Sequence, residues 1–181
     1  KMLSDYAAAH NKPQRFMGVP KTIDNDLPVT DHCPGYGSAA KYIAASLKEI
    51  IRDNESFGAK KPTICIVEIM GRNAGWLTAA AALAKGADCS GADAIYLPEK
   101  VFDMDAFMAK VKELAATKSS VVIAVSEGIH IADGRYVCEL ANENVAVDAF
   151  GHKQMSGTAA YLAQIVAAET GLKTRAIEFS T

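Results

Sequence analysis

The chain has 181 residues, a length that predicts one globular domain with a sizeable core. Its 19 basic and 21 acidic residues give a formal net charge of -2 without a run of either sign, which excludes a nucleic-acid-binding arm and a polybasic membrane patch. The four cysteines are far apart, with no CxxC pair, so the sequence indicates neither a zinc site nor a disulfide framework and predicts a reducing, cytoplasmic location. We find no signal peptide and no apolar run of about 18 residues, so we expect no membrane association.

Strand and helix patterns alternate along the chain, which opens with a helical pattern at residues 1–9. Short apolar runs predict five strands, at residues 15–19, 63–69, 94–97, 120–126 and 175–179. Amphipathic or alanine-rich stretches between them predict four helices, at residues 38–52, 75–85, 104–116 and 157–169. The run at 121–125 is apolar throughout, which indicates a strand that is covered on both faces. This order predicts a three-layer α/β/α fold with a mainly parallel, Rossmann-like sheet.

The loop after the first predicted strand is dense in chemically active side chains. Residues 20–26 place Lys21, Thr22, Asp24 and Asp26 within one short segment. In an extended loop, carboxylates two residues apart point in different directions, so one can take a proton while the other holds a metal ion or a backbone amide. An ordinary polar turn would use the same residue types, and this segment alone does not decide between the two interpretations.

Three further motifs lie at the ends of predicted strands. Gly71 and Arg72 follow the second strand, where the glycine lets the backbone approach a ligand and the guanidinium can bind a phosphate or carboxylate. Glu127 follows the fourth strand, and residues 173–175 bring two basic side chains to the start of the last. Ligands of such sheets bind outside the carboxyl ends of the strands, so these motifs are candidates for one site with the loop. Each motif alone would also fit an ordinary turn or a solvated edge.

Two nucleotide-binding patterns are excluded. Residues 35–40 match GxGxxA, but a long loop separates them from the nearest predicted strand, and a dinucleotide fingerprint needs a tight strand-turn-helix. The sequence also contains no GxxxxGK[ST] segment, so it has no Walker-type phosphate loop.

Taken together, the motifs resemble the phosphofructokinase family in identity, order and approximate spacing. The matching segments are PKTIDND at 20–26, then Thr30, Asp31 and Gly35, VEIMGRNAG at 67–75, SEG at 126–128 and KTR at 173–175. The resemblance covers essentially the whole chain. It implies the α/β fold of that family's substrate domain and a phosphotransferase of glycolysis that converts fructose 6-phosphate to fructose 1,6-bisphosphate.

The resemblance also implies roles for individual residues. Asp24 is the general base that takes the proton of the 1-hydroxyl, with Lys21 and Arg72 as cations beside the transferred group. The sugar phosphate is surrounded by Thr22, Ile23, Asp24, Met70, Gly71, Arg72 and Glu127. Arg175 matches an arginine that reaches the 6-phosphate, often that of a neighbouring subunit, which implies a homodimer or homotetramer. Asp26 is a supporting carboxylate that can lie near a metal ion.

The phosphoryl donor is pyrophosphate or ATP. Pyrophosphate-dependent members of the family have a lysine at the position of Lys21, whereas ATP-dependent bacterial members usually have a glycine, so pyrophosphate is favoured. A non-catalytic, sugar-phosphate-binding regulatory module is a further alternative. Such modules tend to lose the base, and Asp24 is retained here.

The resemblance implies that only part of the family's site lies on this chain. The glycine-rich GGD loop, which binds the donor and Mg²⁺, would precede Lys1, and a further basic motif would follow Thr181. We expect residues 1–35 to end the donor-binding domain and carry the catalytic loop, and residues 36–181 to form the fructose 6-phosphate-binding α/β domain. Thr63 stands where many members have an arginine donated across a subunit boundary. The main Mg²⁺ ligand is expected outside this chain, and the chain alone is expected to show little or no turnover.

Overall fold

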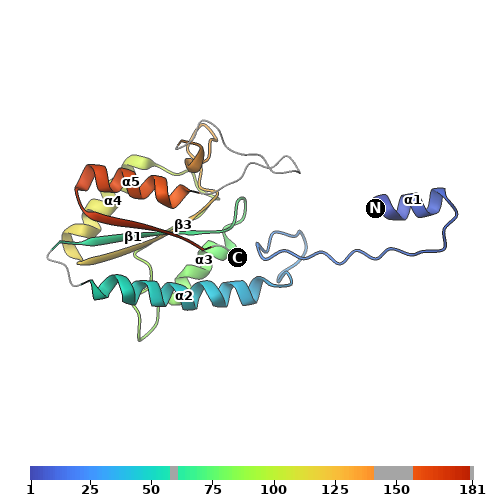
Figure 1. Ribbon diagram of the computed structural model, residues 1–181, viewed down its shortest axis with the longest axis horizontal. Coiled ribbons are helices and arrows are strands. Elements are labelled where there is room, and N and C mark those ends of the chain that lie inside the picture. The colour runs from blue at the N-terminus through green and yellow to red at the C-terminus, as the bar shows by residue number, and fades with distance from the viewer. Residues whose placement is uncertain (58–60, 141–156, 180–181) are drawn as a thin grey trace.

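The computed structural model describes residues 1–57, 61–140 and 157–179, and a parallel β-sheet forms its centre (Figure 1). Its strands, in the spatial order β2-β3-β1-β4, are β1 (Thr63–Ile69), β2 (Ala94–Tyr96), β3 (Ser120–Ser126) and β4 (Lys173–Phe179). All neighbouring pairs are parallel, so the carboxyl ends of the strands meet at one edge of the sheet. Every residue of β1 is buried, as expected for a strand covered on both faces.

Helices cover both faces of the sheet and make the three-layer fold that the sequence predicts (Figure 1). One face is covered by α2 (Tyr36–Ser56), α3 (Trp76–Ala79) and the 3₁₀ helix η1 (Ala80–Ala84). The other is covered by α4 (Met104–Thr117), the 3₁₀ helix η2 (Val137–Leu140) and α5 (Thr158–Thr170). Alternate residues of β1 divide between the two cores: Ile64 and Ile66 pack on the α5 side, whereas Cys65 and Val67 pack on the α2 side.

The predicted helices are confirmed, with one difference of type. The helix predicted at residues 75–85 is a short α-helix, α3, that continues as the 3₁₀ helix η1. The three-residue repeat of a 3₁₀ helix aligns Ala81 and Ala84, and both are fully buried. Packing against α2 therefore outweighs the α-helical preference of alanine in this segment.

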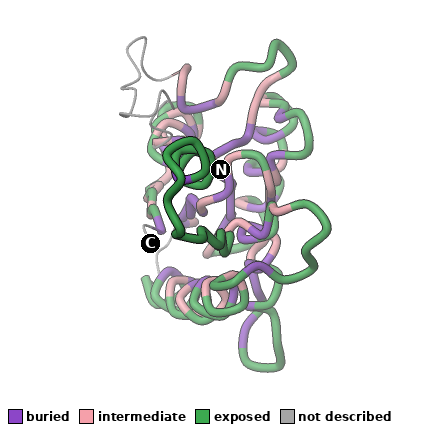
Figure 2. The backbone as a smooth tube through the Cα atoms, turned by 90° about the vertical axis from the view of Figure 1, so that its right-hand side faces the viewer, coloured by how far each residue is buried: buried purple, intermediate pink, exposed green. Residues whose placement is uncertain are grey.

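The strand predicted at residues 15–19 is wrong. After α1 (Met2–Ala9), residues 10–35 contain turns but neither helix nor strand. Residues 10–20 are all exposed and form an extended arm, whereas the rest of the segment loops beside the sheet (Figure 1). Met17 is 91% exposed and Val19 is 82% exposed, so the arm is drawn mostly as exposed chain in Figure 2. A run of apolar residues becomes a strand only where a neighbouring strand pairs with its backbone, and no described strand pairs with this one.

Two findings bear on the environment of the chain. No helix among the described residues is both long enough and apolar enough to cross a lipid bilayer. All four cysteines are buried and none forms a disulfide: Cys33, Cys65, Cys89 and Cys138.

Candidate functional site

The carboxyl ends of β1 and β3 are joined by hydrogen bonds between their following turns. Ser126 donates its hydroxyl to the carbonyl oxygen of Gly71 at 2.6 Å, and Gly71 donates its backbone N–H to Oε1 of Glu127 at 3.3 Å. Glu127 in turn donates its own N–H to the carbonyl oxygen of Ile69 at 2.9 Å. This junction holds the two predicted motifs, one after each strand, in direct contact.

Two glycines let these turns approach each other. Gly71 has a φ of +133°, a conformation that residues with a side chain rarely adopt. Gly128 leaves no room for a Cβ atom, which would overlap the backbone of Arg72. Arg72 therefore emerges from β1 at a position that the backbone of the next turn defines.

The loop of residues 20–26 is held by a side chain that the sequence analysis did not single out. Asn25 is buried with a φ of +58°, a left-handed conformation that asparagine tolerates well. Its amide donates to the carbonyl oxygen of Asp31 at 3.1 Å and accepts from the N–H of Cys33 at 2.8 Å. Asn25 thus points into its own loop and fixes the backbone on which Asp24 sits. Its place between two aspartates in a turn is the sequence pattern that points to this role.

Asp24 is the carboxylate of the loop with the most unusual surroundings. The side chain is half-buried, and its Oδ1 is buried without a hydrogen-bond partner. Burial raises the pKa of Asp24, and the negative charge of Asp26 raises it further. The cations Lys21 and Arg72 oppose this shift. A carboxylate with raised proton affinity and a free oxygen is suited to act as a base.

Glu127 lies across from the loop and is electrostatically coupled to it. Burial raises the pKa of Glu127, whereas the N–H of Gly71 and the charge of Arg72 lower it. The charge of Asp24 raises it again, so Asp24, Arg72 and Glu127 belong to one charge network. Ile23 and Met70 pack against the same hydrophobic core beside this network.

The structure brings together most of the predicted site residues and separates one. The residues at the carboxyl edge and its facing loop are Lys21, Thr22, Ile23, Asp24, Met70, Gly71, Arg72 and Glu127. Arg175 pairs in register with Cys65, which is four residues, or about 13 Å, before the carboxyl end of β1. Its guanidinium forms an ion pair with Oδ2 of Asp53 at 2.9 Å. Arg175 therefore does not join the site of its own chain.

A cavity of about 500 Å³ lies beside the loop. Its lining residues are Asn25, Asp26, Leu27, Thr30, Asp31, His32, Tyr36 and Trp76. The rings of Tyr36 and Trp76 meet edge to face, with centroids 6.5 Å apart. Asp26 is exposed here, and among the described residues no group of three His, Cys, Asp or Glu side chains could hold a metal ion.

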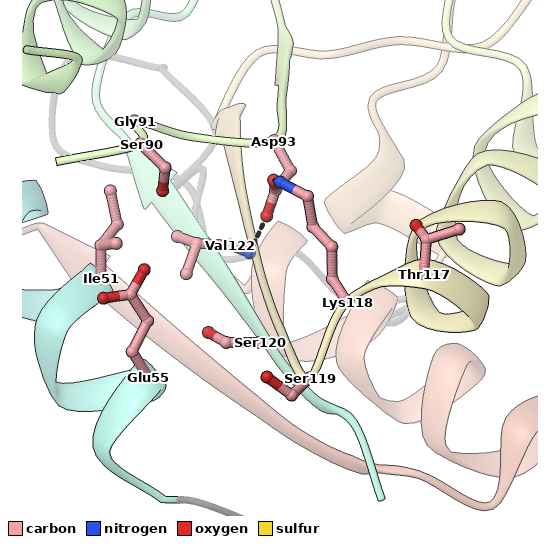
Figure 3. A pocket seen from close by; sticks show the side chains of 10 residues that line it. All are labelled: Ile51, Glu55, Ser90, Gly91, Asp93, Thr117, Lys118, Ser119, Ser120 and Val122. Atoms are coloured by element: carbon pink, nitrogen blue, oxygen red, sulfur yellow. Dashed lines mark hydrogen bonds and ion pairs between the residues drawn. The ribbon is translucent and has the colours of Figure 1, made fainter.

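A second cavity, of about 310 Å³, lies at the opposite edge of the sheet, where β3 begins (Figure 3). Lys118 forms an ion pair with Asp93, whose Oδ2 also accepts the backbone N–H of Val122 at 2.8 Å. Lys118 and Asp93 thus bind each other, in contrast to the carboxylates of the loop at the carboxyl edge.

Comparison with known proteins decides the family. The family model described as Phosphofructokinase matches residues 3–178. The chain belongs to the phosphofructokinase family. The resemblance and the fold class predicted from the sequence are both confirmed.

Several relatives within the phosphofructokinase family are similar over nearly the whole chain. The chain is 45% identical over 171 residues to the pyrophosphate–fructose 6-phosphate 1-phosphotransferase of Xanthomonas campestris pv. campestris (strain B100), a match covering 94% of this chain and 40% of the relative. It is 42% identical over 176 residues to a protein of the same name from Rhodospirillum rubrum, covering 96% and 43%. The crystal structure of pyrophosphate-dependent phosphofructokinase from Nitrosospira multiformis matches with a TM-score of 0.74 and 34% identity, covering 98% of this chain and 40% of that one. The chain thus spans about 40% of the length of these relatives.

Proposed function

We propose that this chain is part of an enzyme that transfers a phosphoryl group from pyrophosphate to the 1-hydroxyl of fructose 6-phosphate. The observation that carries the proposal is Asp24, with a buried oxygen that has no hydrogen-bond partner and with the cations Lys21 and Arg72 close enough to act on its charge. The names of relatives that are 42–45% identical support the same reaction.

The chemistry needs a base at the acceptor hydroxyl and positive charge around the transferred group. In the proposed step, Asp24 takes the proton of the 1-hydroxyl, the oxygen forms a bond to phosphorus, and the bond to the leaving phosphate breaks. The leaving phosphate carries away the electron pair. Lys21 and Arg72 would stabilise the negative charge that is spread over the phosphoryl oxygens.

The substrate would lie over the junction of β1 and β3. We propose that Thr22, Ile23, Met70, Gly71 and Glu127 surround the sugar phosphate, together with Asp24 and Arg72. The backbone at Gly71 has no side chain to block a close approach, which supports a contact there. Arg175 would bind the 6-phosphate in a neighbouring copy of the chain, because it lies too far from the site of its own chain. This assignment requires a homo-oligomer, a dimer or a tetramer.

Pyrophosphate is the donor that Lys21 favours. The lysine brings positive charge to the loop, where it lowers the pKa of Asp24 and can neutralise a bare phosphate leaving group. ATP is the alternative donor. An assay of the full-length protein with each donor distinguishes them: we expect turnover with pyrophosphate and little or none with ATP.

Mg²⁺ is the cofactor implied by this chemistry, and the described residues do not form a complete site for it. Asp26 offers one exposed carboxylate, whereas Mg²⁺ prefers octahedral coordination by oxygens. We propose that Asp26 lies near the ion and that its main ligands come from outside this chain.

We further propose that the chain contains parts of two domains of a cytoplasmic enzyme. Residues 1–35, the first part of which extends away from the sheet, would complete a donor-binding domain, and residues 36–181 would bind fructose 6-phosphate (Figure 1). The absence of a disulfide among the four cysteines supports a reducing compartment. The chain alone would then have little or no turnover, because the donor's half of the site is elsewhere.

The variant Asp24→Asn in the full-length protein tests the catalytic assignment. We expect turnover to fall about 10²- to 10⁴-fold while fructose 6-phosphate still binds, because only the proton acceptor is lost. The matched control Asp105→Asn changes an exposed carboxylate in the first turn of α4 and should leave turnover unchanged. Full activity of Asp24→Asn would overturn the assignment of Asp24 as the base. Binding of fructose 6-phosphate without turnover in the unmodified full-length protein would favour the alternative, a non-catalytic sugar-phosphate-binding module.

A further inference from the structure

Glu68 is a buried carboxylate that the proposed chemistry does not use. It lies on β1 two residues before Met70 and is only 2% exposed. Its neighbours in register are Val125 on β3 and Glu178 on β4. Burial of a carboxylate is costly unless its oxygens are hydrogen-bonded, so the contacts of Glu68 decide what it can do.

The Glu68 carboxylate faces the first turn of α5. Ala159 donates its backbone N–H to Oε2 of Glu68 at 2.9 Å. Gly157, the residue before the helix, provides no side-chain cap of its own. The first amides of a helix need acceptors from outside, and a negative charge there also interacts favourably with the helix dipole. Glu68 therefore acts as a cap from a neighbouring strand and fixes where α5 begins relative to β1.

The same turn of α5 contacts Glu127. Thr158 donates its hydroxyl to the backbone carbonyl oxygen of Glu127 at 3.3 Å. The carboxylate of Glu127 accepts the N–H of Gly71 in the candidate site. Since Thr158 and Ala159 are consecutive, a displacement at the contact with Glu68 would also displace the backbone of Glu127.

We propose that Glu68 is a positioning residue for sugar-phosphate binding, which holds Glu127 in place through the first turn of α5. The proposal rests on the proposed function, in which Glu127 contacts fructose 6-phosphate. Glu68 acts through Ala159 and Thr158 and does not touch the substrate, because it is buried between the sheet and α5.

The surroundings of Glu68 suggest which replacements test its hydrogen bond to Ala159 separately from its charge and its size. Glu178 and Glu127 face it from β4 and from the turn after β3, and the thiol of Cys138 in η2 is also close enough to feel its charge. Oε1 of Glu68 is buried without a hydrogen-bond partner. Glutamine keeps an acceptor for Ala159 without the charge, whereas leucine has a similar size and no acceptor.

The variants Glu68→Leu and Glu68→Gln in the full-length protein form the matched pair. Glu68→Leu should raise the KM for fructose 6-phosphate about tenfold with kcat nearly unchanged, because the loss of one hydrogen bond disturbs a binding group and not the base. Glu68→Gln should stay within about twofold of the wild type, because the contact with Ala159 remains. The control Glu169→Gln, at the far end of α5, should keep the wild-type KM.

Thr158→Val removes the second contact of this series, the hydrogen bond from Thr158 to the carbonyl oxygen of Glu127. It should raise KM to a similar extent, and the double variant Glu68→Leu/Thr158→Val should raise it no further than the larger single effect, since both act on one path. Equal KM values in Glu68→Leu and Glu68→Gln, or additive effects in the double variant, would overturn the proposal. Urea unfolding of each variant shows whether it is folded under assay conditions.

Hydrogen exchange without substrate separates this proposal from the proposed function. The amides of Ala159 and Glu127 should exchange about tenfold faster in Glu68→Leu, as expected for loss of one hydrogen bond, and at the wild-type rate in Glu68→Gln. Unchanged exchange in Glu68→Leu would overturn the positioning role even in an active enzyme. If the wild type fails to phosphorylate fructose 6-phosphate and the exchange still changes as expected, the proposed function fails and the contact path stands.

Discussion

The carboxyl edge and the amino edge of the sheet both carry charged side chains, but in opposite surroundings. At the amino edge, Lys118 pairs with Asp93, whose carboxylate also accepts the backbone N–H of Val122. At the carboxyl edge and its facing loop, burial raises the pKa of Asp24 and of Glu127, and an oxygen of Asp24 has no partner.

The difference shows which edge can act on a ligand. Charges that already bind each other have little to gain from a new partner, whereas partly buried and incompletely paired groups do. The turns after β1 and β3 also lie close together at the carboxyl edge. Gly128 lies against the backbone of Arg72, and Gly71 takes a conformation that residues with a side chain rarely adopt. Variants at the two edges should therefore differ both in the size of their effects and in the property that changes.

The largest effect on stability is expected from Gly128→Ala. A Cβ at this position overlaps the Arg72 backbone, which cannot move without breaking the junction of β1 and β3. Such overpacking should lower the free energy of unfolding by about 3 kcal/mol, measured by urea denaturation. The control is Gly37→Ala, the same change within α2 where nothing lies within 4 Å, and it should stabilise the protein by up to about 1 kcal/mol. Equal stabilities of the two variants would contradict the close approach at Gly128.

Asn25→Ala should reduce turnover without removing any group that contacts the substrate. The change deletes the two hydrogen bonds that hold the loop and places a less tolerant residue at a φ of +58°. Displacement of Asp24 by about 1 Å should lower kcat about 100-fold in the full-length enzyme, measured at saturating fructose 6-phosphate. Wild-type kcat would show that the loop is held by other contacts.

Glu68 should make stability depend on pH near neutrality. Burial, with the charges of Glu178 and Glu127, raises its pKa from 4.5 to about 7, although the N–H of Ala159 opposes the shift. The folded chain therefore holds a proton that the unfolded chain releases between these values, and stability falls as the pH rises from about 4.5 to about 7. Between pH 5 and pH 8 the loss should be about 2 kcal/mol.

The variant Glu68→Gln checks this dependence by urea unfolding at several pH values. It should be the more stable protein at pH 8 and should have a flatter profile, because glutamine does not titrate. Parallel profiles for the wild type and the variant would show that Glu68 does not change its protonation in this range.

The smallest effect is expected at the amino edge, from Lys118→Gln. The lysine is partly exposed, and the nearly buried Asp93 keeps the backbone N–H of Val122 as a partner when the lysine is lost, so the free energy of unfolding should fall by about 1 kcal/mol. The effect should shrink in high salt, and the KM for fructose 6-phosphate should not change. A large change in KM would break the contrast between the two edges.

Much of the fold can be predicted from local patterns. The uniformly apolar runs at 63–69 and 120–126 predict parallel strands buried on both faces, and both are confirmed. The same reasoning fails at residues 15–19, where the composition suits a strand but no partner is described. The pattern of apolar residues predicts how a segment could be buried, whereas formation of a strand also requires a neighbouring strand that pairs with its backbone.

The candidate site was predictable in part, because motifs that follow parallel strands converge at one edge. That rule brings Gly71, Arg72 and Glu127 together, and the structure agrees. It does not anticipate the separation of Arg175, which depends on the register of β4 against β1. Roles that depend on contacts between distant segments were also missed, as with Glu68 and the start of α5.

By itself, the sequence determined the layers of the fold, the position of the reactive loop after an apolar segment, and the family motifs, because these depend on residue type and local spacing. Only the tertiary structure decided which groups share a charge network and which oxygen of Asp24 lacks a partner. It also decided that Asn25 shapes the loop and that Glu68 caps α5. Burial and hydrogen bonding join residues that are far apart in the chain, so they follow from strand order, register and packing, which local patterns do not specify.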